Sequence, residues 1–246
     1  MLHRTNGVGE DFKLLGITFD VELRMGRGVS ILAREAGWRL QSVLRPRRFF
    51  EEKQVVNLYK SQVLSYIESG TPGYYHAAST TLRLLDRVQE RLCRELGITA
   101  ERALEQYRLA PLLCRRDMAM LGLLHRIILN DAPSQLVVLF PFAVPRPAET
   151  SVTRRYSPWL LRRHNKQLKE QTINTDILRH SLFGLVYIYN LLPQSIIDLR
   201  SVRQFQSALQ RALRSAASQR LPSWEYLFSP RLRPVRDVHF QRYFES

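Results

Sequence analysis

Apolar side chains recur at helical intervals through the first half of the chain. The first such stripe begins after Asp20 and continues until Arg45-Pro46. Its members are Val29, Leu32, Ala36, Leu40 and Val43. Intervals of three and four residues place side chains on one face of an α-helix, and a proline ends the run because it has no amide hydrogen. The pattern predicts a helix that ends before Pro46.

Two further stripes predict two more helices. The second stripe follows the acidic pair Glu51 and Glu52 and ends at Gly70, with Pro72 as a stop signal; acidic residues favour a first turn and glycine a helix end. It consists of Val55, Tyr59, Val63 and Tyr66. The third stripe ends at Gly97 and consists of Leu82, Leu85, Val88, Leu92 and Leu96. Ser79, Thr80 or Thr81 is the expected cap of this third helix.

A fourth helix is predicted over about Leu112–Asn130, with Met118, Leu121, Leu124 and Ile128 on its apolar face. Four helices with short connections favour a small bundle. Residues 12–19 are instead typical of a β-strand, with Leu15, Ile17 and Phe19 on one face and Phe12 and Leu14 on the other. No matching strands follow, so this strand is expected to be an isolated edge.

The chain changes character after Asp131. Prolines interrupt any regular element up to Pro158, which predicts an extended connector. A basic run follows, and then the apolar segment 181–193, which is expected to pack on the bundle. Ser201 and Gln204 fit a capping box that opens a helix through Phe205, Leu209 and Leu213. The end, from about Arg220 to Ser246, is a Pro- and Arg-rich tail with a tendency to disorder.

The charge of the chain is strongly basic and uneven. It carries 37 Lys and Arg against 22 Asp and Glu, a net charge of +15, and only five of the basic residues are Lys. Residues 1–150 hold 21 basic and 16 acidic side chains, whereas residues 151–246 hold 16 and 6. Arginine suits phosphate contacts, so the balance favours a polyanionic partner. A general bias toward arginine codons is the alternative, but it does not explain the asymmetry.

Other classes of protein find little support in the sequence. Two cysteines, Cys93 and Cys114, make no disulfide framework and, with His125, no paired zinc-ligand spacing. The apolar stretches fall far short of the ~20 residues that span a bilayer. The expected location is intracellular, nuclear or cytoplasmic, without a membrane partner, and no cofactor or metal site is expected.

Several motifs occur in a fixed order. They are Phe12-Lys13-Leu14-Leu15-Gly16-Ile17-Thr18-Phe19-Asp20, Leu58-Tyr59-Lys60-Ser61 through Glu68-Ser69-Gly70, Leu85-Asp86-Arg87-Val88-Gln89, Arg115-Arg116-Asp117, and Asn190-Leu191-Leu192-Pro193 before Ser201-Val202-Arg203-Gln204-Phe205. Together they resemble the end of the palm and the thumb of reverse transcriptases encoded by non-LTR retrotransposons. The chain departs from that family at Ser69, at Tyr75 and around Gly26-Arg27-Gly28.

The resemblance implies a mainly α fold without a catalytic centre. Its regions are a palm-end strand remnant at 1–20, a thumb-like helical bundle at 21–130, a Pro-rich then basic connector at 131–176, a helical segment at 177–218 and a basic tail at 219–246. The carboxylates that hold magnesium in such polymerases are expected upstream of Met1, and this sequence has no Asp-Asp pair. Because phosphoryl transfer by this mechanism needs two metal ions, we do not expect the chain to be an enzyme on its own.

Two groups of side chains are candidates for contact with RNA or DNA. The better candidate combines basic residues with aromatic rings for base stacking, and it comprises Arg154, Arg155, Tyr156, Trp159, Arg162, Arg163, Lys166 and Lys169. The other is a helix face that bears Arg83, Arg87, Arg91 and Arg94. Asp86, Glu90 and Glu95 are close enough in sequence to pair with these arginines, so a self-paired, solvated face is expected there.

The alternatives belong to other classes. The helices suit a protein-interaction module, or the chain is an inactive pseudogene product without a nucleic-acid role. A third interpretation is a polymerase assembled with a separate palm-bearing chain. Non-specific backbone contact with RNA or DNA is the leading hypothesis.

Overall fold

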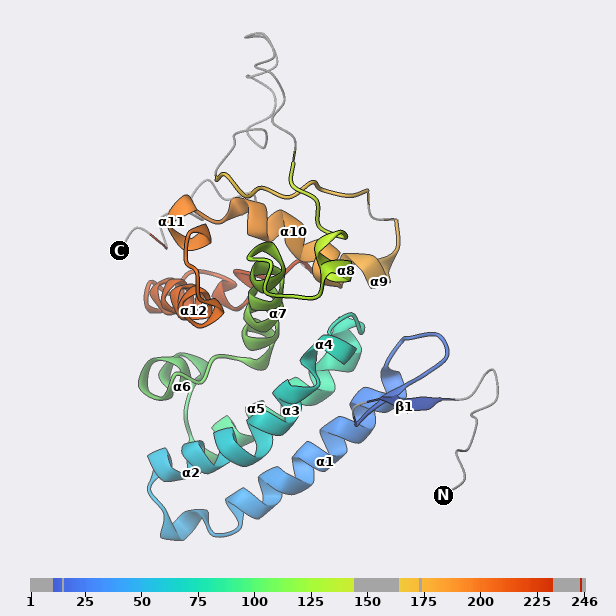
Figure 1. Cartoon of the computed structure of the whole chain (residues 1–246). Coiled ribbons are helices and arrows are strands. Elements are labelled where there is room, and N and C mark those ends of the chain that lie inside the picture. Colours follow the sequence, from blue (N-terminus) through green and yellow to red (C-terminus); the bar gives the residue numbers. More distant parts are fainter. Residues whose placement is uncertain (1–10, 15, 144–163, 173, 232–243, 245–246) are drawn as a thin grey trace. The chain divides into compact units, whose positions relative to one another are not determined.

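The computed structural model describes residues 11–14, 16–143, 164–172, 174–231 and 244, and these are mainly helical, which confirms the predicted fold class (Figure 1). The chain forms two compact units, residues 1–117 and residues 118–246. The division falls inside helix α7 (Leu112–Ile128), whereas the sequence analysis places the end of the bundle at residue 130.

The predicted single strand is a β-hairpin. Strands β1 (Phe12–Leu14) and β2 (Ile17–Phe19) pair antiparallel, with Phe12 opposite Phe19. The chain reverses at Gly16, whose φ of 86° suits glycine. The prediction of an isolated edge strand was therefore wrong: the reversal supplies the missing partner, and it brings Phe12 onto Phe19 with ring centroids 5.2 Å apart.

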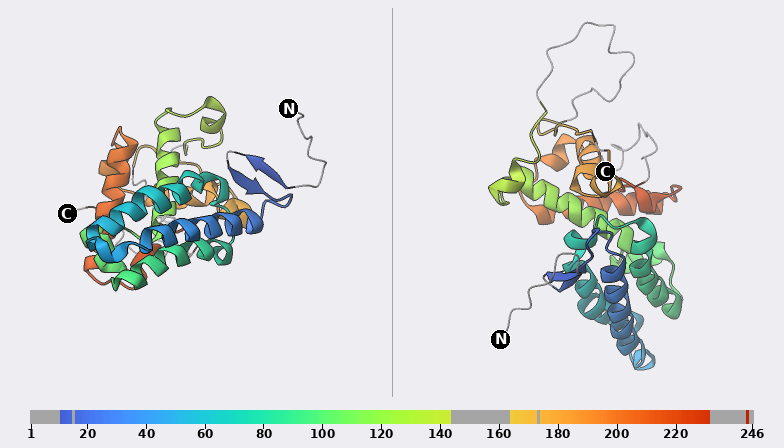
Figure 2. Two further views of the ribbon diagram at one scale, coloured as in Figure 1. Left: turned by 90° about the horizontal axis from the view of Figure 1, so that it is seen from below. Right: turned by 90° about the vertical axis from the view of Figure 1, so that its right-hand side faces the viewer.

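The hairpin lies at the N-terminal end of helix α1 (Gly26–Leu44) (Figure 2). Ile17 and Phe19 of β2 are half-buried against the core of the first unit. Gly28 permits this approach, because a β-carbon there would lie 2.1 Å from the carbonyl oxygen of Thr18. The stripe predicted for α1 is confirmed: Val29, Ala36, Leu40 and Val43 are buried and Leu32 is half-buried.

A second helical rod packs on α1 and contains a wider turn. It consists of α2 (Glu52–Tyr59), the π-helical turn η2 (Lys60–Leu64) and α3 (Ser65–Ser69). A short 3₁₀ turn, η1 (Arg47–Phe49), joins α1 to this rod. Glu51 caps the rod through reciprocal bonds with Gln54. The predicted end of the rod is confirmed, because α3 stops at Ser69 before Gly70 and Pro72 lies just beyond it. Pro72 sits in the first turn of the next helix, α4 (Thr71–Tyr74), where a proline loses no helical hydrogen bond.

Helix α5 (Ser79–Leu96) lies beside α1 and completes the bundle (Figure 1). Its predicted face is confirmed, with Leu82, Leu85, Val88 and Leu92 buried and Leu96 half-buried, and Gly97 ends it with a φ of 65°. The predicted cap was wrong: Ala78 occupies the capping position and Ser79 is already helical. The sequence analysis did not predict α6 (Ala100–Tyr107), which Thr99 caps through the amide of Arg102.

The second unit contains short helices and two longer ones. They are α8 (Ser134–Val137), α9 (Asp176–Arg179), α10 (Leu182–Leu191), α11 (Gln194–Ile197), α12 (Val202–Ser218) and the 3₁₀ turn η5 (Trp224–Tyr226). The helix predicted through Phe205, Leu209 and Leu213 is α12, and all three side chains are buried. Ser201 precedes α12, but its side chain caps no backbone amide, so the predicted capping box is absent.

Two predictions for the later part of the chain need correction within the described residues. The connector at 131–176 is not extended throughout, since it includes α8, although Phe142 and Leu168 form an isolated antiparallel bridge. The tail is ordered where it is described: Trp224 and Phe228 are buried. Buried aromatic side chains, Phe140 in the connector and Trp224 and Phe228 in the tail, stabilise these segments by removing apolar surface from water. Proline content alone therefore does not indicate an extended or disordered segment here.

A histidine lies at the centre of the second unit. His125 of α7 is 0% exposed and stacks on Phe205 of α12 with ring centroids 4.1 Å apart. Its Nε2 lies 2.7 Å from the carbonyl oxygen of Leu199, which only accepts, so Nε2 carries the proton. Nδ1 then accepts from the Tyr189 hydroxyl at 2.9 Å. The neutral imidazole therefore ties together α7, α10 and the start of α12.

This histidine predicts a loss of stability in acid. Burial lowers the pKa of His125 from its usual value of 6.5, and the nearby Lys166 lowers it further, against the bond to Leu199. Since the unfolded state takes up the proton first, stability is full above pH ~6.5 and falls as the pH drops toward the folded-state pKa. We expect urea unfolding at pH 7 and pH 5 to show this loss, and His125→Gln to reduce it. An equal pH dependence in both proteins would contradict this assignment.

Candidate nucleic-acid interface

Four arginines line the side of α5 that faces away from the core of the first unit. Arg83, Arg87 and Arg94 are exposed and Arg91 is half-buried. They follow one another at intervals of four, four and three residues, which places them on one helix face. We call this set the α5 arginine face.

The acidic residues of α5 do not pair with these arginines as predicted. Asp86 binds Arg116 of α7 instead, with Oδ1 2.7 Å from Nη1 and Oδ2 3.1 Å from Nη2. Glu95 binds Arg47 of η1 at 2.9 Å. The expectation of a self-paired face was wrong for these two carboxylates, because arginines from other elements reach them. Among the described residues, the α5 arginine face makes no ion pair, and Glu90 remains the exposed acid beside it.

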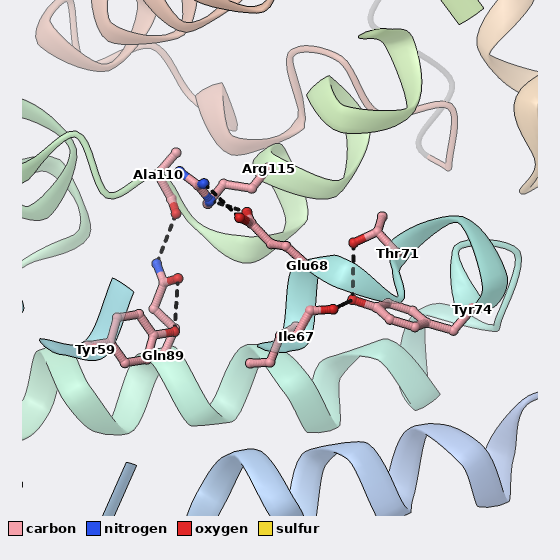
Figure 3. Close-up of polar contacts among 8 residues, drawn as sticks. All are labelled: Tyr59, Ile67, Glu68, Thr71, Tyr74, Gln89, Ala110 and Arg115. Carbon is pink, nitrogen blue, oxygen red and sulfur yellow. Dashed lines mark hydrogen bonds and ion pairs between the residues drawn. The ribbon is translucent and has the colours of Figure 1, made fainter. Parts of the chain in front are cut away.

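Buried polar contacts fix the orientation of α5 (Figure 3). Gln89 lies on its inner side and is 6% exposed. Its Nε2 donates to the carbonyl oxygen of Ala110 at 2.9 Å, and its Oε1 accepts from the Tyr59 hydroxyl at 3.4 Å. Because these bonds hold the inner side of α5, the arginine face is held on the outer side.

The neighbouring part of the bundle is anchored in the same way (Figure 3). Arg115 of α7 forms a two-pronged ion pair with Glu68 of α3. Tyr74 of α4 donates to the carbonyl oxygen of Ile67 at 2.8 Å, and burial raises the pKa of Tyr74 to about 12, so it remains a donor at neutral pH. These contacts fix α3, α4 and the start of α7 within the bundle.

The end of the predicted basic run is anchored to α10. The side chain of Asn190 forms two hydrogen bonds with the backbone of Leu168: it accepts from the amide at 2.8 Å and donates to the carbonyl at 2.9 Å. His164, which is 3% exposed, bonds to the carbonyl oxygen of Tyr189 at 3.2 Å. Lys169 is exposed beyond this anchor and Lys166 is half-buried.

The other members of the predicted basic and aromatic run lie outside the described residues. They are Arg154, Arg155, Tyr156, Trp159, Arg162 and Arg163. The described part of the run thus contributes Lys166 and Lys169 within the second unit, and the α5 arginine face lies within the first.

A second set of arginines, which was not predicted as a candidate site, lies on α12. Arg203 and Arg211 of this helix are exposed and Arg214 is half-buried. No Asp or Glu occurs between Leu199 and Trp224, while five arginines do. This acid-free stretch is the signal in the sequence that indicates the second set.

Neither a metal site nor a membrane-spanning helix is found among the described residues. No group of three or more His, Cys, Asp or Glu side chains among them is arranged to hold a metal ion. Within the same part of the chain, no helix combines the length and apolar character needed to cross a membrane.

Comparison with protein-family models, curated proteins and solved structures found no match. The resemblance to reverse transcriptases therefore rests on the sequence motifs, and the geometry of the arginine-bearing helices is the independent basis for a function.

Proposed function

We propose that this chain binds RNA or DNA through non-specific contacts to phosphates, as the non-catalytic remnant of a retroelement reverse transcriptase. The observation that carries the proposal is the α5 arginine face, whose neighbouring acids Asp86 and Glu95 are engaged by Arg116 and Arg47. Arginines without a carboxylate partner release counterions when they bind phosphate, and this is the main source of sequence-independent affinity. The order of the motifs supports the polymerase ancestry, and Lys169 is an exposed basic residue of the second unit.

The test is a salt titration of the full chain with labelled single-stranded RNA, single-stranded DNA and duplexes, followed by fluorescence anisotropy. The triple variant Arg83→Gln, Arg87→Gln, Arg94→Gln should bind more weakly. The slope of log K against log salt should flatten by about 0.9 for each duplex phosphate that the variant no longer neutralises, and by about 0.7 for each phosphate of a single strand.

A matched control removes three arginines that have acidic partners. Arg24, Arg27 and Arg102 pair with Glu22, Asp11 and Glu52. Replacing these three with glutamine changes the net charge equally but should leave the salt slope nearly unchanged. Equal flattening in both triple variants would reject the α5 arginine face, and a salt-independent wild type would reject nucleic-acid binding altogether.

A protein-interaction module is the second candidate, and exposed aromatic rings favour it. Trp38 is 62% exposed and Phe49 is 74% exposed. Arg34 and Arg48 lie over these rings, 5.3 Å and 4.8 Å from the centroids. Tryptophan and arginine are enriched where proteins bind each other. If this candidate holds, Trp38→Ser should abolish capture of a protein partner, whereas the α5 triple variant should retain it.

A further inference from the structure

The outer side of α12 carries an open hollow of about 350 Å³. We call it the α12 hollow, and it is lined by Leu199, Arg203, Gln204, Ser207 and Arg211. Arg203, Ser207 and Arg211 follow one another at intervals of four residues, so they share one helix face. The opposite face is buried and includes Phe205, Leu209 and Leu213. The helix is therefore held by its apolar side, and its polar side is presented to solvent.

The charge in the α12 hollow is uncompensated. Neither Arg203 nor Arg211 makes an ion pair among the described residues. The acidic residue that precedes them in the sequence, Asp198, accepts a hydrogen bond from the side chain of Gln194 at 2.7 Å. Helix α5, in contrast, carries the exposed Glu90 beside its arginines. An acid-free helix with exposed arginines favours an anionic ligand, because no internal carboxylate has to be displaced first.

Uncharged hydrogen-bond donors also line the α12 hollow. Gln204 lines the α12 hollow rather than forming the predicted capping box, and the hydroxyl of Ser207 lies one turn further along. The side chain of Ser201 accepts no bond from the first amides of this 17-residue helix. Amide, hydroxyl and backbone donors accompany arginine wherever proteins contact phosphate oxygens, and the positive end of the helix dipole adds to the attraction.

The spacing of the two arginines and the openness of the hollow favour a polymer over a small anion. Arg203 and Arg211 are eight residues apart, which is about 12 Å along a helix at 1.5 Å per residue. Phosphates of one duplex strand rise ~3.4 Å each along the axis, so a strand offers several phosphates over that length. Small-molecule sites enclose most of their ligand, whereas this hollow is open to solvent.

We propose that the α12 hollow is a second phosphate-binding site, which takes the phosphodiester backbone of a nucleic-acid strand. The inference rests on the proposed nucleic-acid binding of the chain, but it uses none of the residues of the α5 arginine face. The chain would then hold a strand by each of its two units.

The experiment uses the full chain and labelled RNA and DNA oligonucleotides of equal length. Arg203→Gln with Arg211→Gln should weaken binding roughly tenfold or more, since each arginine donates a charged hydrogen bond. The salt slope should flatten by about one for each arginine. The matched control is Arg126→Gln with Arg179→Gln, two exposed residues of the same unit that bond to the Asp131 carbonyl and to Asp176. The control should bind like the wild type.

Two further measurements distinguish a local site from a general effect of charge. Ser207→Asp places a negative charge in the hollow and should weaken binding much more than Ser207→Ala, which removes only one uncharged donor. Labelling with an arginine-specific dicarbonyl, located by mass spectrometry, should show that the oligonucleotide protects Arg203 and Arg211. Protection of α5 arginines alone, with unchanged affinity of the α12 variant, would overturn the second site and leave the proposed function standing.

The remaining outcomes are also decisive. If wild-type protein binds neither RNA nor DNA at low salt, both proposals fail together. If a poly-glutamate peptide binds as tightly as the oligonucleotides and loses affinity equally in the α12 variant, the hollow is a contact for an acidic protein, and the nucleic-acid assignment is overturned. A larger loss of affinity for RNA than for DNA in the α12 variant, or the reverse, would support the site and show which strand the hollow prefers.

Discussion

Replacing Asp86 with alanine should lower the free energy of unfolding by about 3 kcal/mol, because it leaves a buried guanidinium without its counter-charge. The side chain of Arg116 is only 2% exposed, and both of its terminal nitrogens bind the Asp86 carboxylate. Removing one partner from such a pair exposes the full desolvation cost of the other. Urea unfolding followed by circular dichroism measures the loss. The slope of the unfolding free energy against urea concentration should stay unchanged, because only the stability of the fold is altered.

The exposed ion pair of the same helix is the control for Asp86. Arg47 and Glu95 are 44% and 33% exposed, so Glu95→Ala should cost less than about 1 kcal/mol. Replacing Asp86 and Arg116 together with leucine and methionine should recover part of the loss, since the unpaired buried guanidinium is then removed as well. If Asp86→Ala and Glu95→Ala cost the same, the Asp86–Arg116 pair does not stabilise the fold in the way described.

Phe205→Ala should destabilise the second unit by about 3–5 kcal/mol. The ring is 0% exposed, stacks on His125 at 4.1 Å and lies 6.2 Å from the ring of Tyr189. Truncation would remove a large apolar surface and leave a cavity beside His125, whose two hydrogen bonds depend on its orientation. Chemical unfolding of wild type and variant under the same conditions measures the difference.

Half-buried Val202 on the same helix provides the comparison for Phe205. Val202→Ala removes less surface from water and should cost no more than about 1 kcal/mol. Phe205→Leu keeps most of the volume and should fall between the two. A Phe205→Ala variant as stable as Val202→Ala would show that α12 is not held by this face.

The long helices of the first unit were predictable because the helical spacing of their apolar residues stops at residues that end helices. The stripe of α1 ends at Arg45-Pro46 and that of α5 at Gly97, and each signal has a local physical cause. Burial of Leu40 and Leu85 follows from the same periodicity. Such features depend on residues near one another in sequence, so the sequence alone determined them.

Short elements and caps were not predictable in the same way. The hairpin depends on a reversal at Gly16 within eight residues that otherwise alternate like one strand. Helix α6 has only eight residues, too few for a clear period. The caps at Ser79 and Ser201 failed because the serines fit the composition of a cap but their side chains make no capping bond.

The candidate site was predictable in its residues but not in its pairing. The interval between Arg83, Arg87 and Arg94 showed that they share a face, and this is confirmed as an exposed face. Which acid each arginine meets depends on folding, because Arg116 is 30 residues from Asp86 in sequence. The spacing of residues along α5 could not show that an arginine of another helix binds Asp86.

The wide turn at Lys60–Leu64 has a consequence for how this protein tolerates changes in length. A π-helical turn is a regular helix with a residue added, so removing one residue there would restore an ordinary helix. Because the wider turn takes up its extra residue, that deletion would leave α3 in nearly the same rotational phase. A deletion in the α-helical parts of the rod would instead rotate everything beyond it by about 100°, the angle per residue of an α-helix. Such a deletion in the α-helical parts would point Glu68 away from Arg115, so the π-helical turn is the place where this rod should best tolerate the loss of one residue.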